Sequence, residues 1–214
     1  MPTIRSYRDS CGVARALDVV GERWALLVVR ELLFMPQRFS ELRTALPHAS
    51  SNLLADRLRE LENHGVIHRR KLSSTATAHA YELTDRGRQL EPIVLALGNW
   101  GIDAPTPPEP TSLSATSALI FLRGNIFHAP TAPPIICRLD LNGSVWTVRV
   151  NSGKVDVQTG EPTTADISLR TDPKTLGTLM ANPAALDTAL ADGTVALVGD
   201  PLTLSRLLYG DKHE

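Results

Sequence analysis

The feature that most constrains the fold of this 214-residue chain is a proline-rich segment, APTPPEPTS, at residues 104–112. This segment holds four prolines and no large apolar residue. Proline restricts the backbone and removes a hydrogen-bond donor, so such a run interrupts helices and strands and forms a stiff connection. A chain of this length can bury two modest hydrophobic cores. We therefore expect two domains, residues 1–103 and 113–214, joined by a linker over residues 104–112.

Basic residues are concentrated in the first half of the chain. The net charge of the whole sequence is -1. Residues 1–103 hold 14 Lys and Arg against 12 Asp and Glu, whereas residues 104–214 hold 8 against 11. Between Arg38 and Lys71 there are seven basic residues and only four acidic ones. This local excess favours contact with phosphates over a metal site or a membrane surface.

Helical periodicity dominates the first half. The apolar residues of WALLVVRELLF, residues 24–34, recur on one face of a helix, and Pro36 interrupts that helix. A second short helix is predicted over residues 38–46, and Pro47 ends it. The positions expected to face inward in this second helix are Leu42, Ala45 and Leu46.

The stretch SSNLLADRLRELENHG, residues 50–65, predicts a third helix with two different faces. Ser50 is placed as the N-cap, and Gly65 ends the helix. The side chains expected to face the core are Leu54, Leu58 and Leu61. The opposite face begins with short polar side chains and continues to a longer cation, which suits insertion into a major groove. Its members are Ser51, Asn52, Ala55, Asp56 and Arg59.

Residues 66–84 begin and end with strand-like residues around a small polar middle, which predicts a β-hairpin. Two helices joined by a turn and followed by a hairpin form a winged helix-turn-helix, whose hairpin is the wing. For Arg57 two interpretations stay open, because it could brace its helix or contact phosphate. The residues predicted to contact DNA are Arg38, Ser50, Ser51, Asn52, Asp56, Arg57, Arg59, Arg69, Arg70, Lys71, Ser73 and Ser74.

These segments resemble the HxlR family of bacterial winged-helix transcription regulators. The resemblance covers nearly all of residues 8–102 and includes SCGVARALDVVGERWALLVVRELL, RFSELRTAL, SSNLLADRLRELENHGVIHRR, YELTDRGRQLEPIV and NWG. It implies that double-stranded DNA is a partner and that a homodimer binds a palindromic operator through a dimer interface made by the first helix and the last. The last helix has an apolar stripe that fits such an interface, although the stripe could instead cover its own domain's core. The stripe consists of Leu90, Ile93, Val94, Leu97 and Trp100.

The same resemblance draws attention to Cys11. Some members of the family use a cysteine at this position to sense oxidants or electrophiles, which requires an exposed thiolate of lowered pKa. Arg8 and Arg15 would favour the thiolate, whereas Asp9 would not. The alternative is that Cys11 is a small, buried packing residue. The hairpin also lacks a proline that is common in the family's wing, which leaves the conformation of its tip open.

The second half contains a strong hairpin signal, IICRLDLNGSVWTVRV, at residues 135–150. An Asn-Gly pair between two alternating runs predicts a tight two-residue turn, here at Asn142 and Gly143. The register that follows pairs Leu141 with Ser144, Leu139 with Trp146, Cys137 with Val148 and Ile135 with Val150. This register places apolar side chains on one face of the sheet and a mixed set on the other.

The chain then alternates between strand and helix signals. A strand is predicted over residues 165–170, and a helix starts at Asp172 and Pro173. A second short helix, a strand over residues 194–198 and a last helix after Asp200 complete the pattern. This order resembles the sterol-carrier-protein fold over residues 113–209, mainly in the segments DLNGSVWTVRV and LADGTVALVGDPLTLSRLL.

Members of the sterol-carrier fold enclose lipids between sheet and helices, so the resemblance implies an apolar small-molecule effector. Burying apolar surface contributes about 25 cal/mol per Å², and a modest cavity would suffice for micromolar binding. The expected wall residues are Leu139, Trp146, Leu179, Met180 and Leu204. The alternative is that the same side chains close a solid core.

No motif in the sequence indicates catalysis, a cofactor or a metal. There is no nucleophile elbow, paired-carboxylate site or phosphate loop. His64 and His68 have helical spacing, but Gly65 between them interrupts the helix. Cys11 and Cys137 are too far apart in sequence for a disulfide framework or zinc spacing. With no signal core and no apolar run long enough for a bilayer, we expect a cytoplasmic protein without a membrane partner.

Together these patterns predict an α+β protein. Its N-terminal winged helix-turn-helix is mostly α with a β-hairpin wing, and its C-terminal domain is α+β and similar to sterol carriers. The preferred functional hypothesis is a ligand-responsive transcription regulator. A second hypothesis is a lipid-binding or carrier protein that uses the winged helix for dimerisation or protein docking. A third keeps DNA binding and replaces the effector by redox sensing through Cys11.

Overall fold

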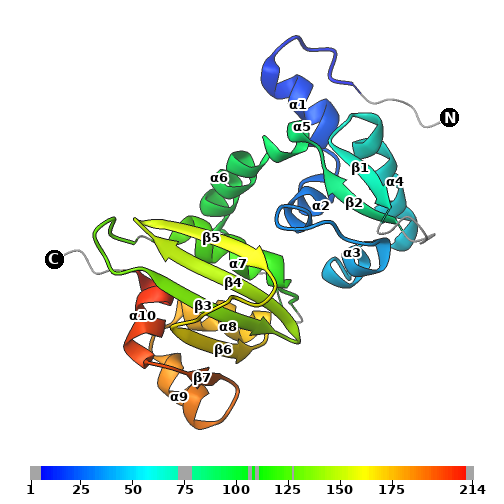
Figure 1. The fold of residues 1–214 in the computed structure, drawn as a ribbon. Helices are drawn as coiled ribbons and strands as arrows, with labels where there is room; N and C mark the ends of the chain where they lie inside the picture. The colour runs from blue at the N-terminus through cyan, green and yellow to red at the C-terminus, as the bar shows by residue number, and fades with distance from the viewer. Residues whose placement is uncertain (1–5, 72–78, 106–107, 109–110, 127, 211–214) are drawn as a thin grey trace. The chain divides into compact units, whose positions relative to one another are not determined.

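The chain forms two compact units, Met1–Ala96 and Leu97–Glu214, each of which mixes helices and strands (Figure 1). The structure is a computed structural model that describes residues 6–71, 79–105, 108, 111–126 and 128–210. The α+β prediction is confirmed. Part of the predicted linker, residues 106–107 and 109–110, lies outside the described residues.

The first unit is built from helices and a two-stranded hairpin. Its elements are α1 (Gly12–Val20), α2 (Ala25–Glu31), α3 (Phe39–Ala45), α4 (Ser51–Asn63), β1 (Ile67–Lys71), β2 (His79–Leu83), α5 (Asp85–Arg88) and α6 (Glu91–Gly101), which continues into the second unit. Strands β1 and β2 pair antiparallel, with Ile67 opposite Leu83. Helix α2 is shorter than the predicted segment 24–34, because Trp24 lies in the left-handed region with φ 79° and acts as the N-cap.

Helix α4 begins and ends where the sequence predicts. The Ser50 hydroxyl accepts a hydrogen bond from the backbone N–H of Leu53 at 3.3 Å, and Gly65 adopts φ +67° just after the helix. The predicted core residues Leu54, Leu58 and Leu61 are all buried. Of the inward positions predicted for α3, Leu42 and Leu46 are buried, whereas Ala45 remains partly exposed. One face of α4 therefore packs against the core of the unit, and the opposite face is accessible to solvent.

The chain passes from strand β2 of the wing to α5, where Gly87 lies in close contact with the backbone of Val66. Thr84 donates its backbone N–H to the carbonyl oxygen of Val66 at 3.0 Å and its hydroxyl to that of Gly65 at 2.7 Å. The N–H of Gly87 in turn donates to the Thr84 hydroxyl at 3.1 Å. A Cβ on Gly87 would lie 2.1 Å from the carbonyl oxygen of Val66. Only glycine fits this position without displacing the backbone.

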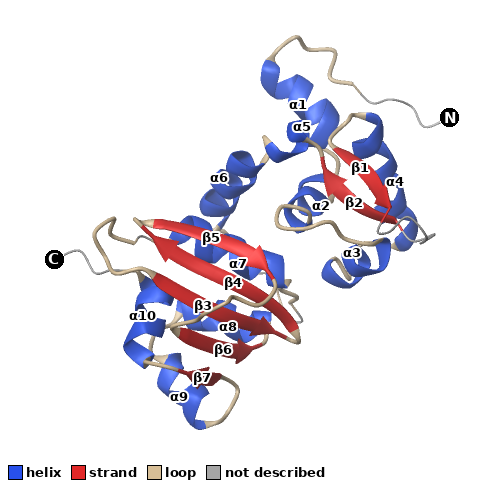
Figure 2. Ribbon diagram, viewed as in Figure 1, coloured by secondary structure: helices blue, strands red, loops and turns tan. Residues whose placement is uncertain are grey.

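The second unit is a five-stranded sheet with helices. Its elements are α7 (Ala115–Asn125), β3 (Ile135–Leu141), β4 (Ser144–Asn151), β5 (Lys154–Thr159), β6 (Ile167–Thr171), α8 (Pro173–Ala181), α9 (Ala185–Ala191), β7 (Ala196–Val198) and α10 (Pro201–Tyr209). The strand order is β5-β4-β3-β6-β7, in which β3 and β6 are parallel and the other neighbours antiparallel. Figure 2 shows α7 and α8 behind the sheet.

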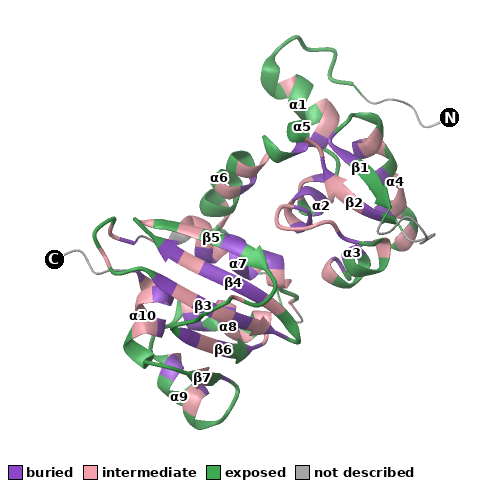
Figure 3. Cartoon of the chain, viewed as in Figure 1, coloured by how far each residue is buried: buried purple, intermediate pink, exposed green. Residues whose placement is uncertain are grey.

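The β3–β4 hairpin has the predicted register. Asn142 and Gly143 form its turn with φ 54° and 85°, and the pairs from Leu141–Ser144 to Ile135–Val150 are all present. Burial alternates along β3, as the purple and pink residues of Figure 3 show. One face of the sheet therefore forms the core of this unit.

Two features of the second unit differ from the sequence-based expectation. Helix α7 was not predicted, yet it buries Ala118, Leu119 and Leu122 and packs against α8 and β5. Strand β7 covers only residues 196–198 of the predicted 194–198. The reason is that Thr194 belongs to a turn, in which its hydroxyl donates to Asp192 and its carbonyl accepts from Thr171.

Within the described ranges, every helix falls short of the length and apolarity that a bilayer crossing requires.

Candidate functional site

The exposed face of α4 contains the predicted base-contacting residues. Asn52 and Arg59 are exposed, and Ser51 and Asp56 are half-buried. Arg59 forms an ion pair with Asp56, one helical turn away. This surface pair contributes little stability, so Arg59 can exchange its partner for a base edge or phosphate at small cost. The face thus combines an amide and a guanidinium, the two groups that form bidentate hydrogen bonds to adenine and guanine.

Arg57 lies on the other side of α4. Its side chain is only 10% exposed and forms ion pairs with Glu60 and, at 3.7 Å, with Glu22 in the turn between α1 and α2. Burial of this kind favours the bracing interpretation over contact with phosphate. The ion pair with Glu22 therefore links α4 to the turn that follows α1.

The wing and the start of α3 present further cations. Arg69 pairs with Glu62 at 3.3 Å and lies over the ring of Tyr81, while Arg70 pairs with Glu82 at 3.4 Å. Lys71 and Arg38 are exposed. Ser73 and Ser74, also predicted to contact DNA, lie outside the described residues.

The apolar stripe of α6 is divided between core and solvent. Val94 is buried and Leu90 half-buried, and both pack against the core of the first unit. Ile93, Leu97 and Trp100 are exposed, and Trp100 is 79% exposed. On α1, Val13 and Leu17 are also exposed apolar side chains. Both helices thus present apolar surface beyond what their own core covers.

Cys11 and Cys137 have opposite environments. Cys11 is exposed at the start of α1, and hydrogen bonds from the backbone N–H groups of Val13 and Ala14 lower the pKa of its thiol. The interpretation of Cys11 as a buried packing residue is therefore wrong. Cys137 lies buried on β3, where desolvation raises its pKa to about 12. Only Cys11 has the exposure and acidity that thiolate chemistry needs.

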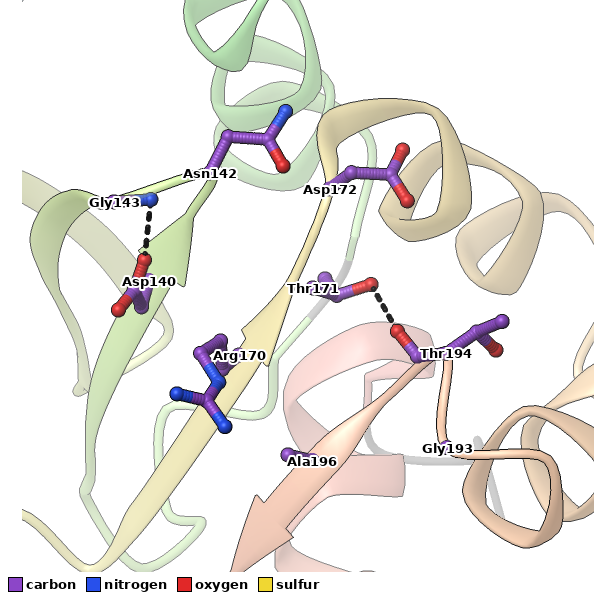
Figure 4. A pocket seen from close by; sticks show the side chains of 9 residues that line it. All are labelled: Asp140, Asn142, Gly143, Arg170, Thr171, Asp172, Gly193, Thr194 and Ala196. Carbon is purple, nitrogen blue, oxygen red and sulfur yellow. Dashed lines mark hydrogen bonds between the residues drawn. The ribbon is translucent and has the colours of Figure 1, made fainter.

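The predicted ligand-pocket residues lie in the core of the second unit. Leu139, Trp146, Leu179 and Leu204 are buried, and Met180 is partly exposed. Leu179 also borders a cleft of about 400 Å³ between α8 and α9. A larger cleft, of about 500 Å³, opens beside the β3–β4 turn and is lined mainly by polar residues, among them Arg170 (Figure 4). This cleft was not predicted from the sequence, because its lining comes from segments that are distant in the chain.

Two family models match the chain in separate regions. Residues 19–107 match the HxlR-like helix-turn-helix family. The HTH-type transcriptional regulator YvaP of Bacillus subtilis (strain 168) is 40% identical over 89 residues, which are 42% of this chain and 82% of YvaP. The chain belongs to the HxlR-like helix-turn-helix family. Another relative, the HTH-type transcriptional regulator YdeP of the same organism, is 37% identical over 93 residues, which are 44% of this chain and 73% of YdeP.

Residues 135–207 of this HxlR-like chain match the SCP-2 sterol transfer family. Both predicted resemblances are thereby confirmed. Among solved structures, the redox regulator HypR in its oxidized form is 35% identical, covers 45% of this chain and 100% of its own, and has a TM-score of 0.43. The HxlR-like protein is a transcriptional regulator with DNA as its partner.

Proposed function

We propose that this HxlR-like regulator binds a palindromic operator as a homodimer and responds to an apolar small molecule in its C-terminal domain. The main support is helix α4, whose leucines are buried while Asn52 and Arg59 remain exposed. The N-cap at Ser50 fixes the start of this helix, and Arg57 ties one side of it to Glu22. Such fixed geometry is what base recognition in a major groove requires.

The exposed apolar residues of α1 and α6 support the dimer. Exposed apolar side chains favour association, because burying them releases water. A two-fold dimer places two copies of α4 for two half-sites of a palindrome.

The SCP-2 match supports the effector. Four of the predicted wall residues are buried and would have to separate around a bound chain, so ligand binding would change the packing of α8 and α10, which contact each other. A coupling of this kind is typically worth about 1–3 kcal/mol, enough for a severalfold to hundredfold change in operator affinity.

We expect the α4 variants Asn52→Ala and Arg59→Ala to weaken binding to the cognate operator by about 1–3 kcal/mol each, with little effect on unrelated DNA. The reason is that each side chain contacts base edges. Lys71→Ala is expected to weaken all DNA sequences alike and to reduce the salt dependence, because it contacts phosphate only. Fluorescence anisotropy with DNA from the protein's own upstream region, and with scrambled DNA, measures all three.

Arg149→Ala is the matched control for these variants, since it removes an arginine of the second unit that lies 3.2 Å from Gln158. It should leave both affinities unchanged. If Asn52→Ala and Arg59→Ala also bind the operator normally, α4 does not read the bases. The hypothesis of a lipid carrier with a docking winged helix would then be favoured.

A redox trigger through Cys11 is a second candidate, favoured by the exposure and the lowered pKa of this thiol. A lower pKa means that more thiolate is present at neutral pH than for an ordinary cysteine. Iodoacetamide should therefore modify Cys11 in the native protein and Cys137 only after unfolding. Mass spectrometry of the alkylated peptides measures both.

The Cys11→Ser variant separates the two triggers. It should lose any response of DNA binding to an oxidant while keeping the response to an apolar effector. An oxidant response that survives this substitution contradicts the redox role of Cys11.

A further inference from the structure

The larger cleft of the second unit lies where three chain segments end. It is formed by the β3–β4 turn, the last residues of β6 and the residues that lead into β7 (Figure 4). Its volume of about 500 Å³ is within the range of small-molecule sites. The lining residues are Asp140, Asn142, Gly143, Arg170, Thr171, Asp172, Gly193, Thr194 and Ala196.

Both carboxylates of the cleft already have partners. Asp172 caps α8 by accepting the backbone N–H groups of Lys174 at 2.9 Å and Thr175 at 3.0 Å. Asp140 accepts the N–H of Gly143 at 2.8 Å and lies 3.8 Å from the guanidinium of Arg138. Asp172 is therefore engaged in the cap of α8, whereas Asp140 has only a long contact with Arg138, which also pairs with Glu161.

Arg170 differs from both carboxylates. In the sheet register it lies between Asp140 on β3 and Ala196 on β7. Across the part of the chain that the structure describes, its guanidinium has neither a hydrogen bond nor an ion pair. The other two arginines on this face of the sheet are engaged, Arg138 with Glu161 at 2.7 Å and Arg149 with Gln158 at 3.2 Å. Arg170 is thus a cation at the wall of the cleft that forms no ion pair within the described residues, although Asp140 is its neighbour in the sheet register.

The turns around Arg170 leave room for a ligand. Gly143 and Gly193 have φ +85° and +78°, and no atom lies within 4 Å of where a Cβ would stand on either. Asn142 stands at the far end of the cleft from Arg170, and the nitrogen of its side-chain amide points away from Arg170 (Figure 4). Thr194 borders this cleft and also the neighbouring one between α8 and α9. That second cleft includes the apolar side chains of Leu179, Ala185 and Ala189.

We propose that Arg170 binds a carboxylate or phosphate group in this cleft. A guanidinium is suited to such groups because its donors match two oxygen atoms at once. The anion is either the head group of an acidic amphiphile, whose chain extends past Thr194 toward the α8–α9 cleft, or a small free metabolite. The proposal rests on the proposed effector function and specifies the chemistry of the effector.

The test uses isothermal titration calorimetry of the full chain with four probes: dodecyl phosphate, dodecanoate, dodecanol and inorganic phosphate. We expect the two acidic amphiphiles to bind the wild type and to bind Arg170→Ala at least about tenfold more weakly, since a charge-assisted contact is lost. Arg170→Lys should retain part of the affinity. Arg149→Ala is the matched control and should bind like the wild type. Because Arg170 is exposed, all variants should melt at the same temperature.

The four probes distinguish the two possible sources of the anion, and they distinguish failure of the anion site from failure of the proposed effector function. Inorganic phosphate that binds as tightly as dodecyl phosphate, and depends on Arg170, identifies a free anion as the ligand. Dodecanol that binds as well as dodecanoate, with Arg170→Ala indistinguishable from wild type, overturns the anion site but keeps the apolar effector. If none of the probes binds, both the anion site and the effector are overturned. Operator binding by α4, measured separately by anisotropy, is unaffected by that outcome.

Discussion

If the protein is the homodimer proposed above, replacing Trp100 with glutamate is expected to convert it into a monomer and to weaken operator binding by about 10²–10⁴-fold, the range that bivalent attachment provides. Trp100 is 79% exposed on α6, so its indole is available to a second copy. A carboxylate at this position would have to be desolvated in an apolar interface, which costs several kcal/mol when no partner compensates it. Light scattering gives the mass, and anisotropy gives the operator affinity.

Leu202→Glu is the matched control, because Leu202 is 74% exposed on α10 and also exchanges an apolar side chain for a carboxylate. It should remain dimeric and bind DNA normally. Both side chains are solvated in the isolated chain, so neither substitution should disturb the core. A Trp100→Glu protein that is still a dimer would show that the exposed stripe of α6 is not the interface.

The variant Gly87→Ala is expected to lower the free energy of unfolding of the winged helix by about 3 kcal/mol, as overpacking at a rigid contact does. The added Cβ would lie 2.1 Å from the carbonyl oxygen of Val66, so the backbone must move. That movement strains the hydrogen bonds of Thr84 that join the wing to α5. Urea unfolding followed by circular dichroism measures the change, and operator affinity should fall with it.

Gly65→Ala provides the comparison within the same unit. Gly65 has φ +67°, but no atom lies within 4 Å of the position that a Cβ would take, so alanine there suffers backbone strain alone, about 1 kcal/mol. Equal losses for the two variants would mean that the junction at Gly87 adapts, and that the contact with Val66 is not rigid.

Elements with local signals were predicted well from the sequence. The register of the β3–β4 hairpin follows from Asn142 and Gly143, because a two-residue turn with positive φ at both positions leaves one pairing only. The start of α4 follows from Ser50, whose hydroxyl satisfies a free N–H of the first turn. Helix α7 was missed because Ala118, Leu119 and Leu122 are buried by contacts with α8 and β5, segments distant in sequence.

The candidate sites divide in the same way. Asn52 and Arg59 could be assigned to the outer face of α4 from helical periodicity, and the structure leaves both exposed. Arg57 is also an arginine of α4, two positions before Arg59. Its side chain is nevertheless buried and pairs with Glu22 in the turn between α1 and α2. The polar cleft could not be predicted at all, because it depends on where three distant turns meet around Arg170.

The sequence by itself therefore determined the helix caps and the hairpin register, which depend on residues within a few positions of one another, and the family and the two fold types, which depend on the order and spacing of such local motifs. Only the tertiary structure decided that the Arg57 side chain is buried and paired with Glu22, that Cys11 is exposed and Cys137 buried, and that Arg170 forms no ion pair among the residues that the structure describes. These properties depend on solvent exclusion and on charges brought together from distant segments. Local patterns do not specify them, because burial and ion pairing are properties of the whole packed unit.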